Sequence, residues 1–178
     1  MVLWLSVSVD EYFKYLKEKV DQIKEKLNFE FGLDNLPYHI SLKITFECPK
    51  DKEDEIIGEI ENYFKTLKSF DLKPKDIEIE NNIVWIRYFE NDYISNVSKD
   101  LNKMLNGKFD IPYHPFDLNF IFHTTLFMLD NIEIVKKGYE LIKNTELPEK
   151  VHVNKYMIGF SLTGEIGTYK VLKEIVIK

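Results

Sequence analysis

Strand-like and helix-like hydrophobic patterns alternate along this chain. Residues 2–9 alternate and are rich in β-branched and aromatic residues, which predicts an opening strand. In the next stretch apolar residues recur at helical spacing, with lysines and acids between them, which predicts a helix that Asp10 caps. The apolar positions of this helix are Phe13, Leu16, Val20, Ile23 and Leu27.

The rest of the pattern predicts the order β-α-β-α-β-β-α-β-α-β-β. The further strands are expected over residues 39–47, 76–80, 83–89, 118–129, 151–162 and 169–177, and the further helices over residues 51–69, 91–106 and 130–144. Asn81-Asn82 predicts a tight hairpin turn, because Asn tolerates positive φ. Gly107 is expected to end the third helix, and Asp130 with Glu133 to form a capping box for the fourth.

Two of the predicted strands carry the same short motif. It reads His-Ile-Ser-Leu at residues 39–42 and His-Thr-Thr-Leu at residues 123–126. Side chains in a strand point alternately to opposite faces, so the histidine and the hydroxyl residue of each motif share a face about 6.6 Å apart. If the two strands lie side by side, two imidazoles and two hydroxyls converge in one groove.

The motif spacing indicates an internal repeat. The two histidines lie 84 residues apart (123 − 39), and the same offset carries the turn at 81–82 to positions 165–166, between the glycines of the last turn. We therefore predict two α-β-α-β-β lobes, covering about residues 10–89 and 91–177, after one leading strand. The expected fold class is α+β, a single bilobal domain over residues 1–178 with two mainly antiparallel sheets around a central groove.

Composition narrows the choice of partners. The 178 residues are 44% hydrophobic, ample for a packed core, and carry a formal net charge of −6. An acidic chain is poorly suited to bind a long phosphate backbone without specificity, although a short nucleotide or RNA end remains compatible with it. Arg87 is the only arginine, so a bidentate guanidinium clamp on phosphate is available at most once.

Cysteine content and hydropathy suggest the cellular setting. Cys48 is the only cysteine, which excludes an intrachain disulfide and predicts a reducing, cytoplasmic environment. The apolar start of the chain lacks a basic region and leads directly into Asp10, so it is read as a strand and not as a signal peptide. No apolar run approaches the length that spans a bilayer, and no membrane partner is expected.

Two histidines and two hydroxyls suit phosphodiester cleavage. In-line displacement needs a base on the nucleophile and an acid on the leaving oxygen, and histidine titrates near neutrality, so one neutral and one protonated imidazole can coexist. Hydroxyl groups can donate to the non-bridging oxygens, whose charge grows in the transition state. The sequence does not distinguish which histidine is the acid and which the base.

The two His-x-Ser/Thr-Leu motifs, each on a strand followed by a helix and a hairpin, resemble those of the 2H phosphoesterase superfamily. That superfamily includes 2′-5′ RNA ligase-like proteins and 2′,3′-cyclic nucleotide phosphodiesterases. The resemblance implies a two-lobed fold around a groove and chemistry without metal or other cofactor. It implies catalytic roles for His39 and His123, and phosphate binding by Ser41 and Thr125. The implied substrate is a cyclic or 2′-5′ phosphodiester in an RNA 3′ end or a small nucleotide.

Three further residues are candidate substrate contacts. No basic residue closely follows the second motif, where many relatives contact phosphate, and Lys43 is the candidate replacement because it is expected on the strand face of His39. Tyr113 and Tyr169 lie near turns that a duplicated fold could bring to the groove mouth, where they would stack on a base; packing in the core is the equal alternative.

Other interpretations of the motifs remain open at this point. The histidines could be structural, or the same groove could bind an RNA end or nucleotide without catalysis. A duplicated scaffold that binds protein is a third alternative. A shared metal site is disfavoured, because no carboxylate or cysteine shares the strand face of either motif. We expect the protein to be a monomer.

Overall fold

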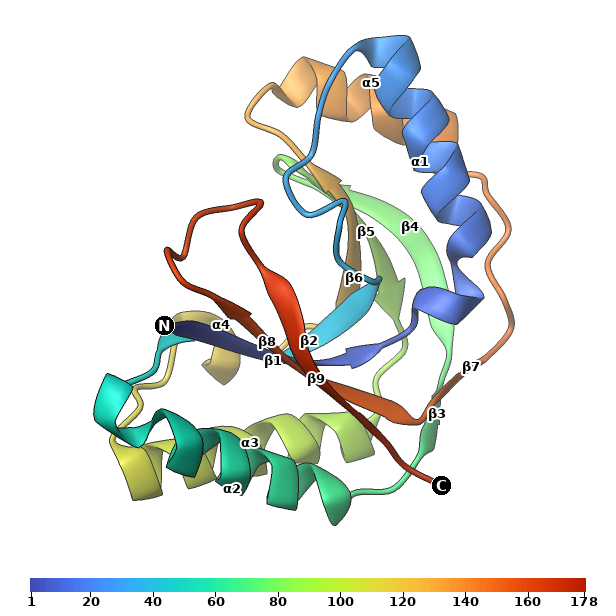
Figure 1. Ribbon diagram of the computed structural model, residues 1–178. Coiled ribbons are helices and arrows are strands. Elements are labelled where there is room, and N and C mark those ends of the chain that lie inside the picture. Colours follow the sequence, from blue (N-terminus) through green and yellow to red (C-terminus); the bar gives the residue numbers. More distant parts are fainter.

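The computed structural model describes residues 1–178 and contains two main antiparallel sheets (Figure 1). The larger sheet has the strand order β2-β1-β8-β9, the smaller has the order β4-β5-β6, and a short ribbon pairs β3 with β7. The strands are β1 (Val2–Ser8), β2 (His39–Glu47), β3 (Phe70–Leu72), β4 (Pro74–Glu80), β5 (Ile83–Tyr88), β6 (His123–Met128), β7 (Val151–Val153), β8 (Lys155–Ser161) and β9 (Lys170–Val176). The predicted α+β class with antiparallel sheets is confirmed.

Each sheet carries a pair of helices on one face. The helices are α1 (Lys14–Leu27), α2 (Glu53–Lys65), α3 (Asp92–Phe109), α4 (Pro115–Leu118) and α5 (Ile132–Ile142). Helices α2 and α3 lie against the larger sheet, and α1 and α5 lie against the smaller one (Figure 1). One continuous core of 38 buried residues runs through both layers. No helix is long and apolar enough to cross a membrane.

The two lobes are interleaved along the sequence. Helix α1 precedes the first histidine strand, β2, but packs against the second one, β6, and against α5. Helix α3 precedes β6 but packs against β2 and α2. Ser98 Oγ on α3 donates a hydrogen bond of 2.7 Å to the Leu42 carbonyl on β2, which connects the helix to this strand. Each lobe is therefore built from segments of both halves of the chain, and the two histidine strands lie between them.

Several helix ends differ from the prediction. Helix α3 continues through Gly107 to Phe109, and Asp110 ends it in the left-handed conformation (φ 56°). Asp10 caps no helix, because its carboxylate accepts a hydrogen bond from the Tyr38 backbone N–H at 2.8 Å, and α1 starts later, at Lys14.

The segments around the second motif also differ. Asn131, and not Asp130, caps α5 by accepting hydrogen bonds from two backbone N–H groups. The predicted strand over 118–129 begins only at His123, because Pro115 starts the short helix α4, with a capping box between His114 and Asp117. The hairpin turn at residues 81–82 is as predicted, with Asn81 at φ 54°.

Candidate active site

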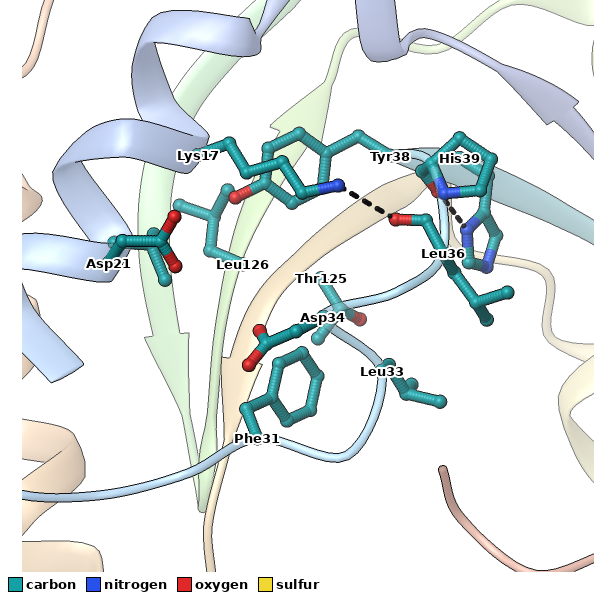
Figure 2. A pocket seen from close by; sticks show the side chains of 12 residues that line it. Lys17, Asp21, Phe31, Leu33, Asp34, Leu36, Tyr38, His39, Thr125 and Leu126 are labelled. Atoms are coloured by element: carbon teal, nitrogen blue, oxygen red, sulfur yellow. Dashed lines mark hydrogen bonds between the residues drawn. The ribbon is translucent and has the colours of Figure 1, made fainter. Parts of the chain in front are cut away.

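The two histidine strands bring both motifs to one place. His39 and Thr125 line one cavity, and His123 and Ser41 line a second one. Each cavity therefore combines the histidine of one motif with the hydroxyl of the other. Figure 2 shows His39 and Thr125 among the residues that line the smaller cavity, together with Leu33 and Leu36. The four residues that the motifs predict as the site lie at the junction of the two lobes.

Both imidazoles are held in the same way by the backbone. His39 Nδ1 lies 2.8 Å from the Pro37 carbonyl oxygen, and His123 Nδ1 lies 2.9 Å from the Ile121 carbonyl oxygen. A carbonyl oxygen can only accept a hydrogen bond, so each Nδ1 carries the proton and donates it. In the neutral ring Nε2 is then the free acceptor, and in the protonated ring it becomes a donor. Each histidine thus presents Nε2 for proton transfer.

A tryptophan packs against each imidazole. Trp4 on β1 lies 4.6 Å from His39, and Trp85 on β5 lies 4.6 Å from His123, measured between ring centroids. Both indoles are buried. Gly159 on β8 makes room for the first pair, because a Cβ at that position would collide with the indole of Trp4. These supports restrict the rotation of both imidazoles, and the sequence analysis did not identify them.

The electrostatic surroundings favour neutral imidazoles. Burial lowers the pKa of His39, the hydrogen bond to Pro37 opposes this, and the nearby His123 lowers it further. Burial also lowers the pKa of His123, the hydrogen bond to Ile121 opposes it, and the positive charge of Arg87 adds to the lowering. Both rings are therefore mainly neutral at pH 7 before an anion binds.

The two cavities differ greatly in size. The one shared by His39 and Thr125 has a volume of about 50 Å³, which admits little more than water. The one shared by His123 and Ser41 has a volume of about 420 Å³, large enough for a nucleoside. Its lining is mainly apolar and includes Ile44, Trp85, Phe116, Phe120 and Ile121, with the amides of Asn81, Asn82 and Asn119.

Comparison with solved structures decides the fold. No protein-family model and no curated protein sequence matches this chain. Escherichia coli LigT, solved with 3′-AMP, is 15% identical and superimposes with a TM-score of 0.58 over 98% of this chain and 96% of LigT. TT0787 of Thermus thermophilus is 14% identical, with a TM-score of 0.59 over 99% and 98% of the two chains. Usb1 of Kluyveromyces marxianus is 13% identical, with a TM-score of 0.51 over 96% and 97%.

These three proteins are members of the 2H phosphoesterase superfamily. This chain has the same fold as LigT, TT0787 and Usb1. The predicted resemblance is confirmed at the level of the fold, over nearly the whole chain. In this LigT-like fold the motif at 39–42 lies on an outer strand of the larger sheet, and the motif at 123–126 lies on an outer strand of the smaller sheet.

Lys43 does not face either motif cavity. The pairing of β1 with β2 shifts register between Ser41 and Lys43, so strict alternation of faces is lost beyond Ser41. The Lys43 side chain is 2% exposed and forms a buried ion pair with Asp117, and it also donates to the Pro112 carbonyl at 3.0 Å. Its ammonium anchors the segment before the second motif, and a substrate contact is not supported.

The two candidate tyrosines have different surroundings. Tyr113 is exposed and lies beside Lys43, Pro112 and His114, in a hollow separate from both histidine cavities. Tyr169 is buried in a cluster with Trp4, and its hydroxyl donates to the Gly164 carbonyl at 3.1 Å. Tyr169 therefore supports the tryptophan behind His39, as the packing alternative anticipated.

Proposed function

We propose that this protein is a metal-independent phosphodiesterase that cleaves a 2′,3′-cyclic or 2′-5′ phosphodiester bond in an RNA end or small nucleotide. The observation that supports this best is the crossed arrangement of the motifs, in which each histidine shares a cavity with the hydroxyl of the other motif. Each imidazole is fixed through Nδ1 and keeps Nε2 free. The pair is thus suited to act from two sides of one phosphorus atom.

The reaction on a 2′,3′-cyclic phosphate would run in line. Neutral His39 accepts a proton from water through Nε2 while the water oxygen attacks phosphorus. The bond from phosphorus to one ribose oxygen breaks, and protonated His123 donates its proton to that oxygen. Ser41 and Thr125 donate hydrogen bonds to the non-bridging oxygens as their charge increases. The product is a phosphomonoester, and proton exchange with solvent restores both histidines.

The unequal cavities support this direction. The nucleoside would occupy the larger cavity, so its ribose oxygen would leave beside His123, and water would attack from the His39 side. The anionic phosphate would favour protonation of one imidazole, which offsets the lowering of its pKa by burial. Crystal structures of LigT with phosphate, 3′-AMP and ATP are consistent with a phosphate-bearing ligand in this fold.

Substitution of the two histidines tests the proposal. His39→Ala or His123→Ala should each slow hydrolysis of a 2′,3′-cyclic nucleotide by about 10²- to 10⁴-fold, in the presence of EDTA. His152→Ala is the matched control, because His152 is an exposed histidine paired with Asp71, outside both motif cavities. Undiminished activity in the double variant, or loss of wild-type activity with EDTA, would refute the proposal. Saturable nucleotide binding without turnover would instead support the non-catalytic binding module.

A further inference from the structure

The only arginine of the chain lies beside the second motif. Arg87 on β5 is the direct cross-strand partner of His123 on β6, so the two side chains share the sheet face that carries the motif. The corresponding partner of His39 is Ser8 on β1. All other basic residues apart from histidine are lysines. The single guanidinium of the molecule is thus located on one side of the candidate site only.

The guanidinium of Arg87 has unused hydrogen-bonding capacity. Its Nε is buried without a partner. Its Nη1 lies 3.6 Å from a Glu78 carboxylate oxygen, which is longer than a hydrogen bond, and its Cζ lies 5.4 Å from the ring centre of Trp85. Buried donors without partners are uncommon in proteins and costly. The side chain nevertheless keeps 26% of its surface exposed, so a ligand can reach it.

Other charges near the motifs do not take this role. Lys43 is neutralised in its buried pair with Asp117. On the His39 side, Lys17 donates to the Leu36 carbonyl at 3.2 Å and shares the smaller cavity with the carboxylates of Asp21 and Asp34. The carboxylate beside Arg87 is that of Glu78 on β4, and Glu80 lines the larger cavity with His123. Arg87 is therefore the cation that remains available to pair with an anion beside His123.

We propose that Arg87 binds the substrate phosphate beside His123 and supplies the positive charge that the sequence lacks after the second motif. This inference rests on the proposed function, because it assigns a residue to the same groove. A guanidinium can donate two parallel hydrogen bonds to phosphate oxygens, and Trp85 and Glu78 would hold its plane. Arg87 would thereby fix the phosphate on the side where the nucleoside lies.

Two substitutions at Arg87 and one control test this assignment. Arg87→Gln should weaken binding of inorganic phosphate, followed by NMR shifts of the histidine rings, by about 10- to 100-fold. It should raise KM for a 2′,3′-cyclic nucleotide more than it lowers kcat. Arg87→Lys should restore part of the loss. Lys75→Gln is the control, since Lys75 is an exposed cation that also pairs with Glu78. It should leave both constants unchanged.

A second readout separates binding from a structural role. Because Arg87 lowers the pKa of His123, Arg87→Gln should raise that pKa in the ligand-free protein and change the pKa of His39 much less, since His39 senses Arg87 only through His123. Phosphate binding and KM equal to wild type in Arg87→Gln would overturn the inference while the phosphodiesterase proposal stands. Arg87-dependent phosphate binding in a protein without turnover would uphold the inference and refute the proposed reaction.

Discussion

The two sides of the groove share their inner construction and differ in their surroundings. On each side Nδ1 of the histidine is held by the carbonyl two residues earlier, and a buried tryptophan packs 4.6 Å from the ring. Beyond that, the His39 side closes around about 50 Å³ and the His123 side opens into about 420 Å³. Ser8 lies opposite one histidine and Arg87 opposite the other.

This difference indicates how two nearly equivalent histidines can take different roles in one reaction. The shared features fix what each imidazole can do, namely transfer a proton through Nε2. The features that differ determine which ligand atom each imidazole meets. Water fits the closed side, and an organic group fits the open side, where Arg87 lies opposite the histidine.

Leaving-group chemistry should separate the two histidines most strongly. His123→Ala should lose about 10²- to 10⁴-fold on a cyclic nucleotide but recover most of this on bis(4-nitrophenyl) phosphate, which has no ribose hydroxyl and whose aromatic leaving group would occupy the larger cavity. Nitrophenolate leaves without a proton, so an acid is not needed. His39→Ala should be equally impaired on both substrates, because water still needs a base. Release of nitrophenolate is measured by absorbance. Rescue of His39→Ala and not His123→Ala would reverse the assignment.

A buried and an exposed lysine–carboxylate ion pair should differ in their effect on stability. Lys43→Ala leaves the Asp117 carboxylate buried without its partner and should lower the free energy of unfolding by about 3–5 kcal/mol. Replacing both members, as Lys43→Met with Asp117→Leu, should restore most of the loss. Lys150→Ala, which removes an exposed partner of Asp71, should have a much smaller effect, because solvent screens that pair. Denaturant unfolding provides the measurement, and equal effects of the two single variants would contradict this distinction.

The support of His39 should depend on a glycine. Gly159→Ala would place a methyl group against the indole of Trp4, so we expect a loss of about 1–3 kcal/mol in unfolding free energy and slower turnover. Gly58→Ala is the matched control, because nothing lies near a Cβ there and the residue is in helix α2. It should stabilise the protein slightly. Unchanged turnover in Gly159→Ala would show that the Trp4 contact does not position His39.

The acid range should reveal the buried histidines through a smaller effect. Because the folded protein lowers the pKa of His39 and His123 below 6.5, the unfolded chain binds more protons between the two values. Their contribution to stability is complete above pH 6.5 and is lost as pH falls below it. Between pH 8 and pH 5 the midpoint temperature of thermal unfolding should therefore fall more steeply for the wild type than for the His39→Gln/His123→Gln variant. Parallel curves would contradict the lowered pKa values.

Local signals in the sequence were sufficient for the motif strands, most helices and the hairpin turn. Hydrophobic periodicity and the spacing of the two histidines can be read along the chain without knowing which segments pack together. They led to the correct fold class. The face of Lys43 could not be predicted, because the register shift beyond Ser41 depends on how β1 pairs with β2. The three-residue strands β3 and β7 are too short for a periodic pattern.

Features of the site that depend on contacts between distant segments could not be predicted from the sequence. The contact of Trp4 with His39 requires two strands and the space left by Gly159 on a third. The sequence shows that Arg87 is the only arginine, but its position opposite His123 follows only from the register of β5 with β6. The exchange of α1 and α3 between lobes involves contacts between residues far apart in the chain.

That exchange of helices limits how the molecule can move. The backbone passes back and forth between the lobes through α1, α3 and the strands beside them, and one core unites both. Two lobes connected by a single hinge can rotate apart, whereas several chain crossings and a shared core oppose such a rotation here. The separation of the two imidazoles is consequently fixed by the fold. Ligands would therefore be selected by how well their size and shape match this separation.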